Sequence, residues 1–157
     1  MWQGKDEAEL LKSICEQFVE HVPFHRVLGI EIVALDPAAP EVRFAMRPEL
    51  VGNTERGSLH GGVIAAVHDL VGSLAAMLDL LCKKHKNLPI AERVERLGKF
   101  STIDLRVDYL RPSIGNSFRC KGKVLRSGSK VGVTHTELFG DDDELQSVCT
   151  AVFALSR

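Results

Sequence analysis

The chain has 157 residues, a length typical of one domain with a substantial core. Hydrophobic residues make up 45% and charged residues 26%, as in an ordinary globular protein. The formal net charge of -1 argues against a general binder of nucleic acids or anionic membranes.

Four scattered cysteines form no C-x-x-C pair and show no metal-ligand spacing, so we expect reduced thiols in a cytoplasmic protein. The first residues lack a basic region followed by an apolar core, and no signal peptide is expected. The longest apolar run, residues 63–78, is interrupted by His68 and Asp69. We expect it to be too short and too polar to span a membrane.

The first predicted element is an amphipathic helix over residues 6–21, within an N-terminal helical segment of about 25 residues, because apolar side chains recur every three or four positions. Pro23 ends this helix or follows it closely. Two strands are predicted over 28–35 and 41–47, around a turn that contains two prolines. Residues 48–60 are predicted to form a loop.

Residues 61–81 predict a long central helix that is apolar nearly all round and must therefore be wrapped by other elements. The basic segment 83–99 predicts an exposed, partly mobile connection with a short helix over 90–97. Four strands are predicted over 100–111, 117–127, 130–139 and 144–155. This order predicts a single α+β domain over 1–157, in which a curved antiparallel sheet surrounds one long helix.

Asp69 and the glycine pair before it carry the chemistry of this helix. Ionised carboxylates are rarely buried without a partner or a function, so Asp69 is either a catalytic group or the partner of an Arg or Lys at a subunit contact. Gly61 and Gly62 leave free N–H groups at the positive end of the helix. A base or nucleophile together with oxyanion donors indicates acyl transfer. His68 points about a hundred degrees away from Asp69, so we expect no dyad.

This stretch resembles the PaaI-type branch of the hotdog-fold acyl-CoA thioesterases. The matching pattern is Gly57, His60-Gly61-Gly62 and an Asp nine residues after the histidine. The resemblance continues through residues 101–112 and the later strands, and covers about the last two-thirds of the chain. It implies hydrolysis of medium- or long-chain fatty acyl-CoA to a free acid and CoA, without a cofactor or a metal.

The resemblance also implies roles for single residues. Asp69 activates water as a general base or attacks the thioester itself, and the Gly62 N–H stabilises the oxyanion. His60 is a helix cap or contacts the substrate, and Asn53 holds the water or the carbonyl. Thr102 positions the water or simply suits a strand, and Ser101 replaces it if the register shifts by one.

Substrate contacts are expected at two kinds of residue. A basic rim would bind the phosphates of coenzyme A, and the segment 83–99 either adds to it or is only solvated surface. The acyl group would lie against the central helix and the preceding loop, at Val63, Ala66, Leu70 or Leu50. The substrate-binding set predicted here comprises Gly61, Val63, Arg111, Arg126, Gly128 and Lys130.

The resemblance further implies a homodimer, or a pair of dimers, with each site shared between two chains. One alternative within enzymes is an aryl-CoA thioesterase. A hotdog dehydratase is disfavoured, since its sites lack this His-to-Asp spacing. The alternative outside enzymes is a non-catalytic sensor of acyl-CoA or a partner of acyl-carrier protein.

Overall fold

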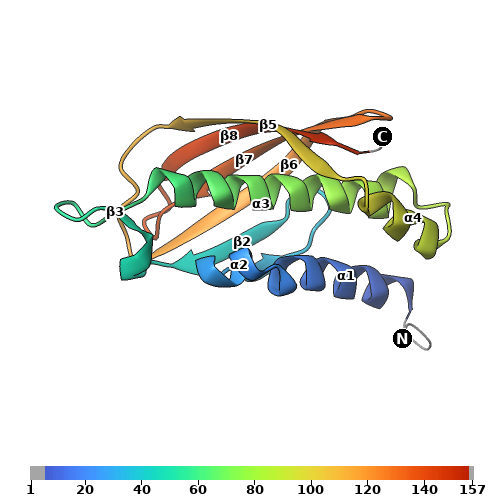
Figure 1. The fold of residues 1–157 in the computed structure, drawn as a ribbon, viewed down its shortest axis with the longest axis horizontal. Coiled ribbons are helices and arrows are strands. Elements are labelled where there is room, and N and C mark those ends of the chain that lie inside the picture. Colours follow the sequence, from blue (N-terminus) through green and yellow to red (C-terminus); the bar gives the residue numbers. More distant parts are fainter. Residues whose placement is uncertain (1–5, 156–157) are drawn as a thin grey trace.

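A computed structural model describes residues 6–155, in which a curved antiparallel sheet wraps one long helix (Figure 1). The predicted α+β hotdog arrangement is confirmed. The prediction about a signal peptide falls partly on residues 1–5, which lie outside the described residues, as do residues 156–157 of the predicted domain.

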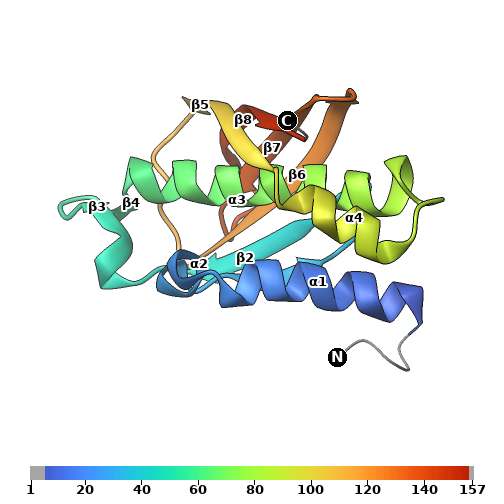
Figure 2. The same ribbon diagram turned by 45° about the vertical axis from the view of Figure 1, so that its right-hand side comes forward.

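The central helix α3 spans Gly61–Asp79 and continues into a π-helical turn, Leu80–Lys84. Two helices precede it, α1 (Glu7–His21) and α2 (Pro23–Leu28), and α4 (Ile90–Leu97) follows it. Figure 2 shows α1 and α4 on the same side of α3, near its C-terminal half. The sheet covers the opposite side.

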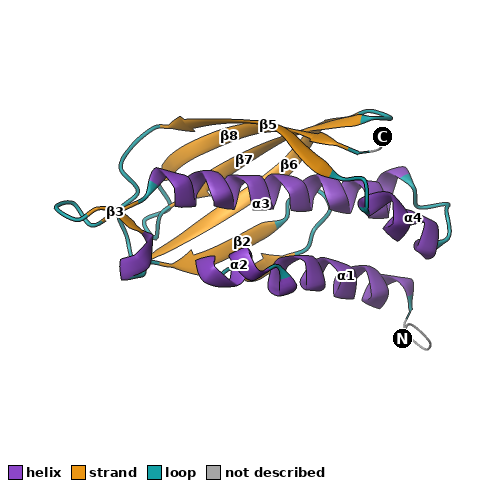
Figure 3. Cartoon of the chain, viewed as in Figure 1, coloured by secondary structure: helices purple, strands orange, loops and turns teal. Residues whose placement is uncertain are grey.

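Six strands pair in the order β1-β2-β6-β7-β8-β5, and every neighbouring pair is antiparallel (Figure 3). A separate hairpin, β3–β4, leads into α3. The strands are β1 (Glu31–Ala34), β2 (Glu41–Ala45), β3 (Val51–Asn53), β4 (Ser58–Leu59), β5 (Ser101–Tyr109), β6 (Ser117–Ser127), β7 (Val131–Phe139) and β8 (Leu145–Ala154). The last four strands agree with the sequence prediction to within two residues.

Two glycines let α3 lie close to the sheet. A Cβ at Gly72 would lie 2.8 Å from the Thr134 hydroxyl, and one at Gly122 would lie 2.9 Å from the Val71 side chain. Cβ atoms do not occupy such distances, so larger residues would push the helix off the sheet. The inner face of α3 is accordingly buried along most of its length.

The continuous helix from Gly61 to Lys84 has 24 residues and is long and apolar enough to cross a membrane by length and composition. Our prediction that this run is too short is therefore wrong in length. Most of its apolar window is buried against the rest of the chain, which is the environment of a core helix.

Two other predictions need correction. The strand expected over 28–35 begins late, because Pro23 starts α2 and Gly29, at φ 68°, ends it. The loop expected over 48–60 contains a 3-10 turn and the β3–β4 hairpin.

The segment 83–99 contains the predicted short helix but is not exposed throughout. Arg93 of α4 is 3% exposed, and its guanidinium donates to the carbonyls of Leu88 and Leu81 and to the Glu7 carboxylate. These contacts fix α4 against α1 and the end of α3.

Candidate functional site

The start of α3 is built around His60. Its Nδ1 accepts a hydrogen bond from the Gly62 N–H at 2.9 Å, so His60 is the N-cap of the helix. The His60 N–H donates to the Leu50 carbonyl at 2.8 Å. Gly52 allows the β3–β4 hairpin to approach, since a Cβ there would lie 2.5 Å from the His60 Cα. The capping role expected for His60 is therefore present.

Tyr109, at the end of β5, lies over the same turn. Its hydroxyl donates to the Gly61 carbonyl at 2.9 Å, and a Cβ at Gly61 would lie 3.5 Å from that hydroxyl. The Gly61 carbonyl and the Gly62 N–H belong to one planar peptide unit. Tyr109 and His60 thus hold opposite ends of that unit. Sequence reasoning missed Tyr109, whose only signal was an aromatic residue ending the strand.

Asp69 is half-buried on α3, and its nearest hydrogen-bond partner comes from β5. The Thr102 hydroxyl donates to Asp69 Oδ1 at 2.9 Å. A register shift between Thr102 and Asp104 marks a β-bulge. The bulge turns Thr102 toward the helix together with Leu105 and Val107, and leaves Ile103 facing outward. Thr102, rather than Ser101, is the residue that contacts Asp69.

His25 of α2 lies within electrostatic reach of Asp69. Burial lowers the pKa of His25, while hydrogen bonds to the carbonyls of Val19 and Phe18 and the Asp69 carboxylate oppose that shift. The ring stands edge-on to Phe18, with centroids 5.6 Å apart. His25 is therefore a titratable group of the α1–α2 corner whose charged form the Asp69 carboxylate favours, which the sequence did not indicate.

His68 points away from Asp69 and into the core, as its helical position predicted. Its Nδ1 lies 2.7 Å from the Thr136 hydroxyl and its Nε2 2.8 Å from the Ser147 hydroxyl. Burial, with a smaller contribution from His135, lowers the pKa of His68 to about 4. His68 is a neutral core group that links α3 to β7 and β8.

The glycine turn and Asp69 are separate within one chain. Asp69 lies eight positions after Gly61 on α3, a rise of about 12 Å along the helix. Asn53 belongs to the hairpin at the N-terminal end, where its side-chain oxygen accepts from the Arg56 N–H at 3.0 Å. One small carbonyl group cannot touch both places.

The residues expected to bind coenzyme A also divide into two groups. Arg111 follows the end of β5, whereas Arg126, Gly128 and Lys130 lie at the β6–β7 turn, beside the start of β5. Nine residues of β5 separate the two places, a length of about 30 Å. Val63 is partly buried and packs against the core.

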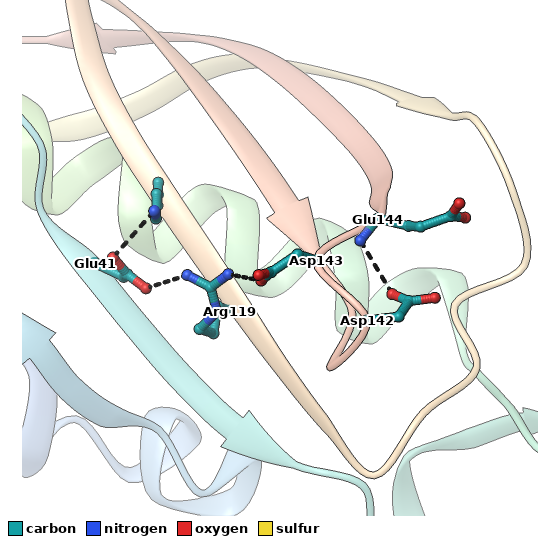
Figure 4. Close-up of polar contacts among 6 residues, drawn as sticks. Glu41, Arg119, Asp142, Asp143 and Glu144 are labelled. Carbon is teal, nitrogen blue, oxygen red and sulfur yellow. Dashed lines mark hydrogen bonds and ion pairs between the residues drawn. The ribbon is translucent and has the colours of Figure 1, made fainter.

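Arg111 is paired with an acidic residue of the same chain. Its partner is Glu144, at the end of the β7–β8 turn. Figure 4 shows the Glu144 N–H donating to the Asp142 carboxylate in this turn. Asp143 in turn binds Arg119 of β6, and Arg119 also binds Glu41 of β2 at 2.9 Å. At the other end, the Lys84 ammonium donates to the Gly128 carbonyl, so the basic segment does reach the β6–β7 turn.

Of the four residues expected to contact the acyl group, two are inaccessible to a bound chain. Leu50 and Leu70 are buried in the main core, at 3% and 2% exposure, and no bound chain can reach them without repacking. Ala66 remains partly buried against that core.

A long helix wrapped by an antiparallel sheet, with a carboxylate midway along it and a glycine turn at its start, defines a hotdog-fold protein. The sequence profile of the thioesterase superfamily matches residues 56–147. The chain belongs to the thioesterase superfamily.

Named relatives match more of the chain than the family profile does. A Salmonella typhimurium protein named medium/long-chain acyl-CoA thioesterase YigI is 39% identical over 92% of this chain and 93% of its own. The Escherichia coli protein of the same name is 37% identical over the same shares. A crystal structure from Shewanella oneidensis, described as related to the thioesterase superfamily, is 41% identical with a TM-score of 0.90. It covers 96% of this chain and 97% of that one.

Proposed function

We propose that this chain hydrolyses acyl-CoA thioesters to a free acid and CoA. The observation that carries the proposal is Asp69, a half-buried carboxylate midway along α3 that accepts a hydrogen bond from Thr102 of β5. Among residues 6–155 Asp69 forms no ion pair. This argues against a purely structural Asp–Arg or Asp–Lys contact within the chain. The relatives named as acyl-CoA thioesterases support the substrate class.

In the proposed reaction Asp69 takes a proton from water, the resulting hydroxide attacks the thioester carbonyl, and the carbon–sulfur bond breaks. The CoA thiolate then takes up the proton. Alternatively, Asp69 attacks the carbonyl directly and expels the CoA thiolate, which leaves a mixed anhydride. Water then hydrolyses the anhydride to the free acid, restores the Asp69 carboxylate and supplies the proton that the thiolate takes up. Thr102 restricts the rotation of the carboxylate in both routes.

We propose that the oxyanion is stabilised at the start of α3, by the Gly62 N–H with Gly61 beside it. The positive end of the helix dipole favours negative charge there. In the resting chain the Gly62 N–H is shared with His60, so His60 orients this donor and the oxyanion competes for it. Asn53 would hold the attacking water or the carbonyl.

The separation of about 12 Å between Asp69 and Gly61 supports a site made by two chains. A homodimer would place Asp69 of one chain opposite His60, Gly62 and Asn53 of the other. The β5 strand is an edge of the sheet and carries the exposed apolar residues Ile103 and Tyr109, which makes it the proposed contact surface. Pairing of dimers into a tetramer remains part of this proposal.

A site made by two chains would also determine how coenzyme A binds. Arg111 and the β6–β7 turn lie at opposite ends of one sheet, so a shared rim requires residues from two chains. The proposed nucleotide contacts are Arg126, Gly128 and Lys130, with Arg111 contributed by the second chain. We also propose a single cytoplasmic domain, supported by four free cysteines among the described residues.

The test is thiol release from butyryl, octanoyl, palmitoyl and hydroxyphenylacetyl-CoA, with the wild type beside Asp69→Ala. Turnover of the fatty acyl forms that depends on Asp69 is the expected result. A preference for the aryl ester would move the substrate class to aryl-CoA. Binding of CoA without turnover of any ester, in a folded protein, would contradict the enzymatic proposal.

A further inference from the structure

Two apolar hollows lie between α1 and α4, beyond the residues so far assigned to the site. The first, 440 Å³, is lined by Ile14, Gln17, Phe18, His21, Met77, Leu97 and Phe100. The second, 470 Å³, is lined by Leu10, Ile14, Ile90, Ala91, Val94 and Glu95. Ile14 borders both, so the two hollows adjoin at this residue, and together they are called the groove below. Figure 2 shows the backbones of α1 and α4 that flank it.

The lining follows from the helical repeat. On α4, Ile90, Val94 and Leu97 recur at intervals of four and three residues and share one face. On α1, Leu10 and Ile14 share a face in the same way. The two apolar stripes face each other across the groove, and its polar groups, such as Glu95, lie on residues that also reach solvent.

The groove lies on the C-terminal side of the candidate catalytic carboxylate along α3. Phe100 lies two residues before Thr102, the hydrogen-bond partner of Asp69. Met77 lies eight residues beyond Asp69 on α3, about 12 Å further along the helix. The groove therefore lies between the level of Thr102 and the C-terminal end of α3, on the side of Asp69 away from the glycine turn.

Arg93 fixes the positions of the helices that line this groove. Its buried guanidinium ties α4 to the carbonyl of Leu81 at the end of α3, and to Glu7 in the first turn of α1 at 2.7 Å. A cation that is 3% exposed and bonded to three elements holds the helices at a set separation. The side chain of Arg93 thus keeps α1 and α4 apart, and the groove between them stays open.

We propose that the groove between α1 and α4 binds the hydrocarbon chain of the substrate and sets the chain length that the enzyme prefers. This inference rests on the proposed function. An acyl chain attached to a carbonyl at Asp69 needs an apolar path with few polar partners. The inner route past Leu50 and Leu70 is closed by core packing, whereas the groove is open and apolar. Chains long enough to pass Ile14 reach the second hollow.

The test fills the groove at two depths. Val94→Trp fills the distal hollow, and because Val94 is 36% exposed the larger side chain should be tolerated. Ile14→Trp blocks the junction. Val33→Trp on β1, at a residue that is 48% exposed and distant from the groove, is the matched control. kcat/KM is measured for butyryl, octanoyl, dodecanoyl and palmitoyl-CoA, with folding checked by circular dichroism.

Each buried methylene contributes roughly fourfold to binding, so loss of the distal hollow should lower kcat/KM for palmitoyl-CoA by about tenfold or more. Butyryl-CoA turnover should stay at the wild-type level in Val94→Trp, and Val33→Trp should leave the whole profile unchanged. Ile14→Trp should move the cutoff to shorter chains. If folded Val94→Trp and Ile14→Trp keep the wild-type ratio of palmitoyl to butyryl turnover, the groove assignment is wrong. Absence of Asp69-dependent turnover with every ester would instead remove the proposed function, and the groove assignment with it.

Discussion

The Thr102 hydroxyl donates to the Asp69 carboxylate across 2.9 Å. This hydrogen bond joins the second residue of β5 to the middle of α3. The β-bulge at Ile103 makes this contact possible, since regular alternation would direct Thr102 away from the side on which Leu105 and Val107 pack. A bulge beside a functional carboxylate re-aims one side chain without disturbing the rest of the strand.

Thr102→Val should lower kcat by about tenfold, because a hydrogen bond to a charged group is worth roughly 1.5 kcal/mol at an accessible position. Thr102→Ser keeps the donor and should retain most activity. Ser101→Ala is the positional control and should behave as wild type. Steady-state kinetics on one fatty acyl-CoA would show this order, and equal activity of Thr102→Val and wild type would contradict the positioning role.

Asp69→Asn should reduce hydrolysis by about two orders of magnitude or more, as expected for loss of a general base or nucleophile. The substitution is isosteric and the site is only half-buried, so the free energy of unfolding should change by less than about 1 kcal/mol. Urea unfolding measured beside activity separates the two effects. A large loss of stability would mean that Asp69 is chiefly structural.

Tyr109→Phe removes the hydroxyl that holds the Gly61 carbonyl. Since that carbonyl and the Gly62 N–H share one rigid peptide unit, we expect kcat to fall roughly fivefold, equivalent to about 1 kcal/mol for a neutral hydrogen bond. KM should change little, because the ring remains in place. A rise in KM at unchanged kcat would indicate that Tyr109 contacts substrate instead.

His68 should make stability fall with acidification. Its pKa is lowered from 6.5 to about 4 in the folded chain, so the unfolded chain takes up the proton first as the pH drops. The contribution is complete above pH 6.5 and is lost progressively toward pH 4, with a total on the order of 3 kcal/mol. His68→Gln cannot titrate. Urea unfolding from pH 7 to 4.5 should therefore show a steeper loss in wild type than in His68→Gln, and parallel curves would refute this assignment.

The sequence predicts much of this fold because its strongest signals are periodic. The all-round apolar run over α3 and the alternating strands from β5 to β8 depend on local residue order, and each was found within two residues of its expected bounds, apart from the π-helical end of α3. The helix α2 was missed since six residues that begin with a proline carry too little periodicity. The burial of Arg93 was missed because its partners lie far apart in the sequence, on α1, on the π-helical turn after α3 and in the loop before α4.

The candidate site was predictable in type but not in arrangement. The spacing of His60 and Asp69 identifies two chemical groups on one helix, and helical geometry places them apart. The contacts of Thr102 and Tyr109 arise from the position of β5 over α3, which depends on sheet order and on a bulge that the sequence does not mark. The separation of Arg111 from Lys130 likewise follows from strand pairing.

We propose that Asp69 of one chain acts with the glycine turn of another. Asp69→Asn and Gly62→Pro each remove one partner, and proline is tolerated in the first turn of a helix, where the N–H has no intrahelical partner. The two inactive proteins are unfolded and refolded together at equal concentration, and activity is measured after gel filtration. We predict recovery of about a quarter of wild-type activity, because half of randomly assorted dimers are mixed and each mixed dimer holds one intact site. Mixed dimers that stay inactive would contradict the claim.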